Sequence, residues 1–372
     1  MIEDVIKKFD IKGELVNIEI NDSGNINNTY VATFKLSNNC LKKYLVQRIN
    51  TTVFTEPYKL MKNIEGVTAY LKKQLTALND SIHQVLEVVK TEDNKSLCCI
   101  ENNNKRDYYR IYEFIENAVT YDCSTDSNIV YNTGAAFGSF QRLLKDYPMN
   151  KLNETIKDFH DTKKRYQGFI NDIKIDSKNR VMEVSKEIVF ILMREDIYSL
   201  IMDKLGTDMI PYRVTHNDTK VNNVMMNKNT GDYLAVIDLD TVMPGSMLFD
   251  YGDGIRSTAS NAKEDETDLN KVSLNLELFE AYTKGYLSEM APYITEDELS
   301  LMGESIRIIT MELAIRFLND YINGDTYFKI NYEKHNLDRA RNQLALVSDI
   351  ENKLDYINQF IVDCYEQHKS QN

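Results

Sequence analysis

The sequence of 372 residues is poor in the side chains that bind zinc or form disulfides, with five cysteines and five histidines. An odd number of cysteines without any CxxC pair argues against a disulfide framework. The cysteines are Cys40, Cys98, Cys99, Cys123 and Cys364. The histidines show no HExxH or other zinc spacing. These absences exclude a zinc site and predict free thiols.

Long apolar runs and an excess of positive charge are also missing. The longest uninterrupted apolar run that we find, Ile188 to Met193, is far shorter than the ~18 residues of a membrane span. The stretch MIEDVIKKFDIKGE carries charges where a signal peptide would be apolar. The net charge of −13 would repel nucleic-acid phosphates. We therefore expect a cytoplasmic protein that binds neither membranes nor nucleic acids, and we find no sign of an obligate protein partner.

The composition, with 42% hydrophobic and 27% charged residues, is that of a globular enzyme, and the length suggests two lobes. The first third alternates like strands joined by turns. We expect strands over Tyr30–Leu36, Tyr44–Ile49, Ser96–Ile100 and Tyr108–Ile115, and a helix over Lys59–Leu78.

After about residue 116 the apolar spacing becomes helical. It predicts helices within 140–147, 156–170, 180–205, 269–290 and 304–321. We therefore expect an α+β fold with a small β-rich lobe at residues 1–115 and a larger helical lobe at 116–372. Two lobes suit a ligand bound in the cleft between them.

The segment 212–256 carries most of the chemistry. His216, Asp218 and Asn223 have the H-x-D-x-x-x-x-N spacing of a kinase catalytic loop. In that arrangement Asp218 is the base, Asn223 binds a metal, and Lys220 reaches the γ-phosphate. We interpret His216 as a structural residue that hydrogen-bonds to backbone.

A second element, the apolar strand over residues 234–237, ends in Asp238, which takes the place of the kinase magnesium ligand. Asparagine and aspartate oxygens are ligands that Mg²⁺ prefers, and Asp240 adds a further candidate ligand. We expect Asp250 and Asp253 to anchor the loop. An isolated HxDxxxxN occurs often by chance, but the strand ending in Asp238 strengthens the kinase interpretation. No phosphate loop, dinucleotide fingerprint or GxSxG elbow competes with it.

The segments HNDTKVNNVM, VIDLDTVMPG and DYGDGIR resemble the aminoglycoside phosphotransferase (phosphotransferase enzyme) family of the protein-kinase-like fold. The stretch ELAIRFLNDYINGDTYF, from Glu312 to Phe328, is similar to N-acetylhexosamine 1-kinases. The resemblance implies transfer of phosphate from ATP, with Mg²⁺, to the anomeric hydroxyl of N-acetylglucosamine or N-acetylgalactosamine, in carbohydrate metabolism. The implied partners are ATP and an amino sugar.

Residue by residue, the resemblance makes Asp218 the base on the sugar hydroxyl, with Asn223 and Asp238 as magnesium ligands. It implies that Arg316 and Tyr327 bind the sugar, since a guanidinium can donate to hydroxyls and a tyrosine ring can cover a sugar face. The alternative for Arg316 is an ion pair along the helix with Glu312 or Asp320.

On the nucleotide side, the resemblance implies a loop that contains Gly24, Asn25, Asn27 and Asn28. The following strand lacks the expected lysine, and we take Arg48 as a candidate for phosphate binding, with Glu65 as its possible partner. The hinge would run through Glu113 and Ile115, whose backbone groups would bind adenine.

Two other hypotheses stay open. The first is a kinase for an amino alcohol such as choline, another sugar or an aminoglycoside. The second is a non-catalytic nucleotide-binding protein of the same fold. The sequence does not decide the epimer, the nucleotide, the oligomeric state or the residue that replaces the missing lysine.

Overall fold

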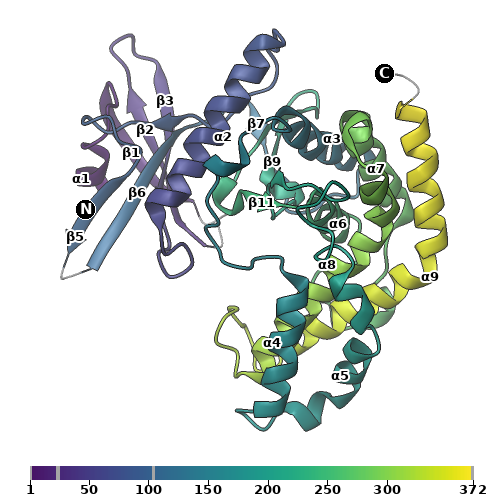
Figure 1. Cartoon of the computed structure of the whole chain (residues 1–372). Coiled ribbons are helices and arrows are strands. Elements are labelled where there is room, and N and C mark those ends of the chain that lie inside the picture. The colour runs from purple at the N-terminus through teal and green to yellow at the C-terminus, as the bar shows by residue number, and fades with distance from the viewer. Residues whose placement is uncertain (1, 22–25, 103–104, 370–372) are drawn as a thin grey trace.

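An antiparallel sheet organises the N-terminal lobe in the computed structural model, which describes residues 2–21, 26–102 and 105–369 (Figure 1). The strand order is β1-β2-β3-β6-β4, and β5 also pairs with β6. The strands are β1 (Glu14–Asn21), β2 (Asn28–Lys35), β3 (Leu41–Arg48), β4 (Val88–Val89), β5 (Cys98–Asn102) and β6 (Lys105–Glu113).

Two helices cover opposite faces of this sheet. Because side chains alternate along a strand, Tyr44 and Val46 of β3 face α1 (Ile2–Ile6), whereas Leu45 packs against the α2 side. The long helix α2 (Pro57–Ala77) covers the face nearer the other lobe. Gln47, on the same side as Leu45, therefore points toward the space between the lobes.

The second lobe is mainly helical. Its α-helices are α3 (Ser127–Leu143), α4 (Thr162–Ile175), α5 (Ser185–Leu192), α6 (Met247–Thr258), α7 (Leu276–Met290), α8 (Glu296–Ile322) and α9 (His335–Lys369). Its short strands are β7 (Ala118–Val119), β8 (Arg213–Thr215), β9 (Val224–Asn227), β10 (Tyr233–Val236) and β11 (Met243–Gly245). They form the order β10-β9-β7 and the pair β11-β8.

The predicted α+β two-lobe architecture is confirmed, with corrections in the helices. Residues 180–205 are not one helix, since only Ser185–Leu192 is α-helical and short 3₁₀ turns flank it. The helix predicted over 269–290 begins at Leu276, after an Asn275 cap. The boundary predicted between residues 115 and 116 falls between β6 and β7. No helix in the described ranges has the length and apolarity needed to span a membrane.

Glycines allow α3 and α7 to cross at close range. A Cβ atom at Gly285 would clash with the carbonyl oxygen of Tyr131, and one at Gly134 with that of Tyr282. The two backbones therefore touch where a side chain would hold them apart. By contrast, a Cβ at Gly168 of α4 would meet no atom within 4 Å.

Gly285→Ala is expected to lower the free energy of unfolding by roughly 1–3 kcal/mol, since overpacking forces the helices apart. Gly168→Ala is the matched control. It is expected to stabilise by about 0.5–1 kcal/mol, because alanine is the better helix former at an exposed helical site. Urea unfolding of both variants measures the difference, and equal effects would contradict the close crossing.

Candidate active site

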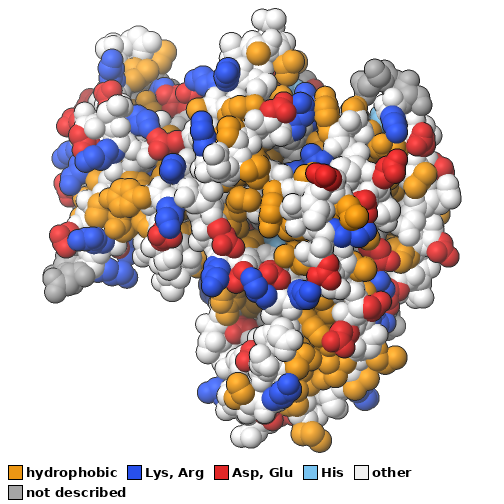
Figure 2. All heavy atoms as spheres, in the orientation of Figure 1, with side chains coloured by type: hydrophobic (Ala, Val, Ile, Leu, Met, Phe, Trp, Pro, Cys, Tyr) orange, Lys and Arg blue, Asp and Glu red, His pale blue; other side chains and the backbone are white. Residues whose placement is uncertain are grey.

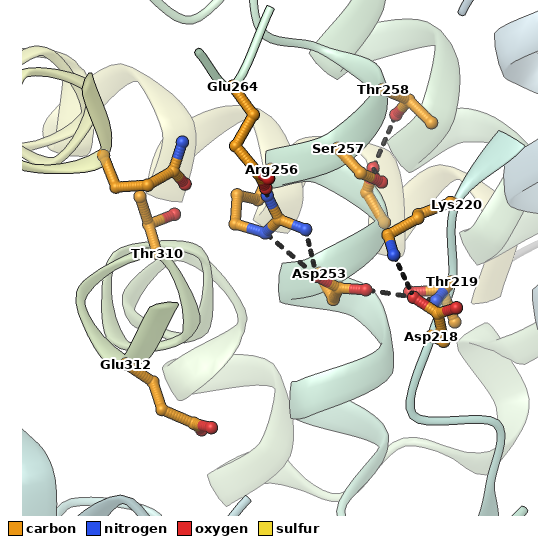
Figure 3. Close-up of polar contacts among 12 residues, drawn as sticks. Asp218, Thr219, Lys220, Asp253, Arg256, Ser257, Thr258, Glu264, Thr310 and Glu312 are labelled. Carbon is orange, nitrogen blue, oxygen red and sulfur yellow. Dashed lines mark hydrogen bonds and ion pairs between the residues drawn. The ribbon is translucent and has the colours of Figure 1, made fainter. Parts of the chain in front are cut away.

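The loop that follows β8 is held on the first turns of α6 (Figure 3). The carboxylate of Asp250 accepts the backbone N–H groups of His216, at 2.8 Å, and Asn217, at 2.7 Å. One turn further on, Asp253 accepts the N–H of Thr219 at 3.1 Å. These bonds fix the path of the backbone on both sides of Asp218, as expected for Asp250 and Asp253.

Asp218 lies between two side chains of its own loop. Its Oδ1 is 2.7 Å from Nζ of Lys220, and its Oδ2 accepts from Nδ2 of Asn223 at 3.1 Å. Although burial alone would lower the pKa of Lys220, the nearby Asp218 and Asp253 carboxylates raise it. Lys220 is therefore a stable cation beside a carboxylate that can accept a proton.

Pairing of β9 with β10 brings Asn223 and Asp238 to the same place. Val224 lies opposite Val236 in this antiparallel pair, so the residue before β9 and the residues after β10 lie at one end. The N–H of Ile237 donates to the carbonyl oxygen of Asn223 at 2.9 Å. Asp238 follows in the left-handed region, with φ of 56°, which turns its side chain out of the strand direction.

His216 stabilises the positions of Asn223 and Asp238. Its Nε2 lies 2.8 Å from the carbonyl oxygen of Ile237, next to Asp238. The side chain is fully buried and touches the ring of Phe137 edge-on. It therefore joins the two loops as a structural residue, as the sequence indicated.

Three carboxylates crowd the end of the hairpin, and this crowding fits a divalent cation. Surrounding protein removes water from the Asp238 carboxylate, and the negative charges of Asp240 and Asp218 repel it. Both effects raise the pKa of Asp238 to about 7, although part of the residue is exposed to solvent. A cation bound there would relieve the repulsion. Among the described residues, no three His, Cys, Asp or Glu side chains form a metal cage by themselves. Asp238 and the Oδ1 of Asn223 are the protein atoms that would hold Mg²⁺, which usually takes its other ligands from phosphates and water.

The predicted nucleotide residues have different surroundings. Asn27 joins the lobes, since its Nδ2 donates to Asp240 at 2.7 Å and its Oδ1 accepts the N–H of Asn50. Asn28 is exposed at the start of β2. Gly24 and Asn25 lie outside the described residues.

Arg48, Glu113 and Ile115 complete this predicted set. Arg48 lies on the α1 face of the sheet, turned from the cleft, and its Nη2 donates to Asp107 at 2.6 Å. Glu113, at the end of β6, forms a 2.8 Å ion pair with Lys42, and Ile115 is buried in the core under α2.

Glu65 of α2 does not contact Arg48. Its carboxylate pairs with Lys90 and accepts from the hydroxyl of Ser96. A charged side chain of β6, Arg110, does enter the space between the lobes. Arg110, which the sequence analysis did not select, is fully buried and forms an ion pair with Asp240. A lone arginine in the strongly β-prone run Tyr108–Ile115 was the signal that could have found it.

A pocket of about 530 Å³ lies between α4, α8 and the loop before α9. Basic and acidic side chains gather around the upper end of α4 (Figure 2). The guanidinium of Arg316 lies 5.5 Å from the ring centres of Phe159 and Phe328 and 6.0 Å from that of Tyr327. The lining includes four cations, Lys157, Lys164, Arg165 and Arg316, against two carboxylates, Asp158 and Asp320.

Neither helix neighbour pairs with Arg316. The Glu312 carboxylate contacts His160 and Arg165, and no ion pair within 4.0 Å joins Arg316 to a carboxylate of the described residues. Asp320 instead accepts three backbone N–H groups, those of residues 326–328, each at 2.9 Å. These bonds fold the loop so that Tyr327, 64% exposed, stands at the rim of the pocket.

His160 connects this pocket to the loop of Asp218. Its Nδ1 lies 3.1 Å from Glu312, and its Nε2 lies 3.4 Å from the carbonyl oxygen of Asn217. Although burial alone would raise the pKa of Glu312, His160 and Arg165 lower it. A chain of contacts therefore leads from Arg165, which lines the pocket, through Glu312 and His160 to the residue before the candidate base.

A β-rich lobe, a helical lobe, and a carboxylate that lies beside a lysine and near an asparagine–aspartate pair are the arrangement typical of small-molecule kinases of the protein-kinase-like fold. The particular family follows from comparison with known sequences. Residues 18–293 match the Phosphotransferase enzyme family, and the chain belongs to it.

Solved structures support the fold assignment. An aminopropanol kinase associated with a microcompartment superposes with a TM-score of 0.63 at 12% identity, over 96% of this chain and 98% of that chain. An aminoglycoside phosphotransferase from Alicyclobacillus acidocaldarius gives 0.60 at 10% identity, over 97% and 96%. An amicoumacin kinase determined with AMP-PNP and Ca²⁺ gives 0.54 at 14% identity, over 98% and 96%.

Proposed function

We propose that the protein is an N-acetylhexosamine 1-kinase, which transfers the γ-phosphoryl group of ATP to the anomeric hydroxyl of N-acetylglucosamine or N-acetylgalactosamine. The observation that carries this choice is the pocket around Arg316, a cation that lies among aromatic rings and has no carboxylate partner in the described part of the chain. Such a group can donate to sugar hydroxyls and to an acetamide carbonyl, while Tyr327 covers a sugar face.

The charge of the pocket disfavours cationic acceptors. Its two carboxylates are already engaged, because Asp158 pairs with Lys164 and Asp320 accepts backbone N–H groups. An ammonium group of choline or of an aminoglycoside would meet four cations and no free carboxylate. An uncharged sugar avoids this repulsion.

The reaction follows from the arrangement of the loop. Asp218 accepts the proton of the sugar 1-hydroxyl while the oxygen of that hydroxyl bonds to the γ-phosphorus. The bond between the γ-phosphorus and the oxygen that bridges it to the β-phosphate breaks, which releases ADP. Lys220, 2.7 Å from Asp218, stabilises negative charge on the transferred group. Mg²⁺, held by Asn223 and Asp238, would neutralise the phosphate oxygens.

The proposal is tested by ADP release with ATP, Mg²⁺ and a panel of N-acetylglucosamine, N-acetylgalactosamine, glucose, choline, homoserine and kanamycin. We expect turnover on the N-acetylhexosamines, and a sugar 1-phosphate as the product by ³¹P NMR. Turnover on choline or kanamycin alone would overturn the sugar assignment. Nucleotide binding without turnover on any acceptor would favour the non-catalytic alternative.

Arg316→Gln is expected to raise the KM for the sugar by about 10- to 100-fold, since the loss of a hydrogen-bonding cation leaves sugar polar groups unpaired. Arg316→Lys is expected to recover little of this, because lysine lacks the planar fork. The KM for MgATP in the same variants is the internal control and should change less than about twofold. An unchanged sugar KM would contradict the role given to Arg316.

A further inference from the structure

The hydrogen bonds of Arg110 account for its whole guanidinium group. Its Nε and Nη2 donate to Oε1 of Gln47 at 3.0 and 2.8 Å. Its Nη1 and Nη2 donate to the two carboxylate oxygens of Asp240 at 2.5 and 2.9 Å, and Nη1 also lies 3.9 Å from the sulfur of Met61. All five N–H donors of an arginine therefore have protein partners. In this state Arg110 has no donor left for a phosphate.

Asp240 is the point where the N-terminal lobe meets the metal-binding loop. Besides the bidentate contact with Arg110, its Oδ2 accepts from Asn27 of the β1–β2 turn. Two N-terminal residues, Asn27 and Arg110 of β6, thus contact one carboxylate, and Gln47 of β3 supports this contact through Arg110. Asp240 follows Asp238 by two residues, in the short 3₁₀ turn that Asp238 introduces.

A buried ion pair of this kind is poorly explained by stability alone. Arg110 is 1% exposed and Asp240 3% exposed, and removing two charges from water costs about as much as their attraction returns. The pair does, however, fix geometry, because a bidentate arginine defines both the distance and the plane of its carboxylate partner. Any movement of β6 relative to the Asp238 turn would break it.

We propose that Arg110 is a positioning residue for phosphoryl transfer. Supported by Gln47, it holds Asp240 and thereby fixes both the position of β6 relative to the Asp238 turn and the direction of Asp238. Asp240 then serves the inter-lobe pair rather than the metal. The inference rests on the kinase class of the chain and is independent of which acceptor the proposed function assigns.

The test compares Arg110→Gln, Arg110→Lys, Asp240→Asn and the double variant Arg110→Gln/Asp240→Asn. We expect Arg110→Gln and Asp240→Asn each to raise the KM for MgATP and to lower kcat. In each variant kcat/KM for MgATP should fall by about 10- to 100-fold, as for residues that support metal ligands. The KM for the acceptor should stay within about twofold. The double variant should be no worse than the poorer single variant, because both changes break one pair.

Rescue separates positioning from a general loss of stability. Gln47→Lys in the Arg110→Gln background puts a cation on β3, facing the same Asp240, and should recover at least part of the ATP affinity. Arg194→Gln is the matched control, since Arg194 makes a bidentate pair with Glu351, at 2.7 Å for both contacts, remote from the cleft. It should lower the melting temperature without changing either KM.

Calorimetric binding of AMP-PNP with Mg²⁺, in the absence of acceptor, measures the same effect without turnover. Because no acceptor is needed, this measurement tests the role of Arg110 even if no acceptor of the panel is phosphorylated. Arg110→Gln with wild-type AMP-PNP affinity and wild-type KM for MgATP would overturn the proposal. So would strictly additive effects in the double variant, or a higher Mg²⁺ requirement in Asp240→Asn alone, which would make Asp240 a metal ligand.

Discussion

Asp218→Asn is expected to lower kcat on the order of 10²- to 10⁴-fold, the range over which a positioned general base contributes. Asparagine keeps the shape of the side chain but cannot accept the proton of the attacking hydroxyl. Asn223 donates to the backbone carbonyl of Asp218, and Asp250 accepts the backbone N–H of Asn217. Neither bond depends on the charge of Asp218, so the loop should keep its path. Steady-state kinetics with saturating ATP and acceptor measure the loss.

Asp232→Asn provides the control for this variant, because Asp232 is an exposed carboxylate between β9 and β10. It should have wild-type kcat. The KM for ATP in Asp218→Asn should change far less than kcat, since the lost interaction forms in the transition state. Near-normal turnover in Asp218→Asn would mean that Asp218 is not the base.

Asp238→Asn is expected to raise the Mg²⁺ concentration for half-maximal activity at least about tenfold and to lower kcat on the order of 10²-fold. The reason is the loss of the charged candidate ligand that the hairpin places beside Asn223. Removal of metal from the wild-type protein with EDTA should abolish activity, and added Mg²⁺ should restore it.

The same variant has an opposite effect on stability. At pH 8 and without metal, the Asp238 carboxylate is repelled by Asp240 and Asp218, so Asp238→Asn should raise the melting temperature. Gain of stability with loss of activity separates a ligand site from a folding defect. A lower melting temperature together with an unchanged Mg²⁺ requirement would contradict the assignment of Asp238.

The strands β2, β3, β5 and β6 and the helix α2 could be predicted from local patterns of apolar residues, whereas α1, β1 and β4 were not predicted. The predicted strand Tyr44–Ile49 and helix Lys59–Leu78 differ from β3 and α2 by only a few residues. The helical lobe was harder. The helix α9, of 35 residues, escaped prediction, since its buried positions are diluted by polar ones such as Asn336, Asn342 and Gln343.

The loop around Asp218 could be predicted because its residues are adjacent in sequence and their spacing is fixed by chemistry. Contacts between distant strands could not be predicted in this way. Arg110 and Asp240 are 130 residues apart, and only the alternation of β6 decides that Arg110 faces the cleft. For Arg48 the alternation of β3 gives the opposite direction, and the residue packs beside Asp107. A shift of one residue along a strand moves a side chain to the opposite face of the sheet.

Asp320 has a thermodynamic consequence for binding. It closes the loop before α9 with three backbone bonds, and Asn336 of α9 donates a fourth at 2.9 Å. The conformational entropy of this loop is therefore lost during folding and not when a ligand arrives. A molecule bound in this pocket would meet a preorganised wall, so most of its contact energy would remain available for affinity and for discrimination between similar molecules.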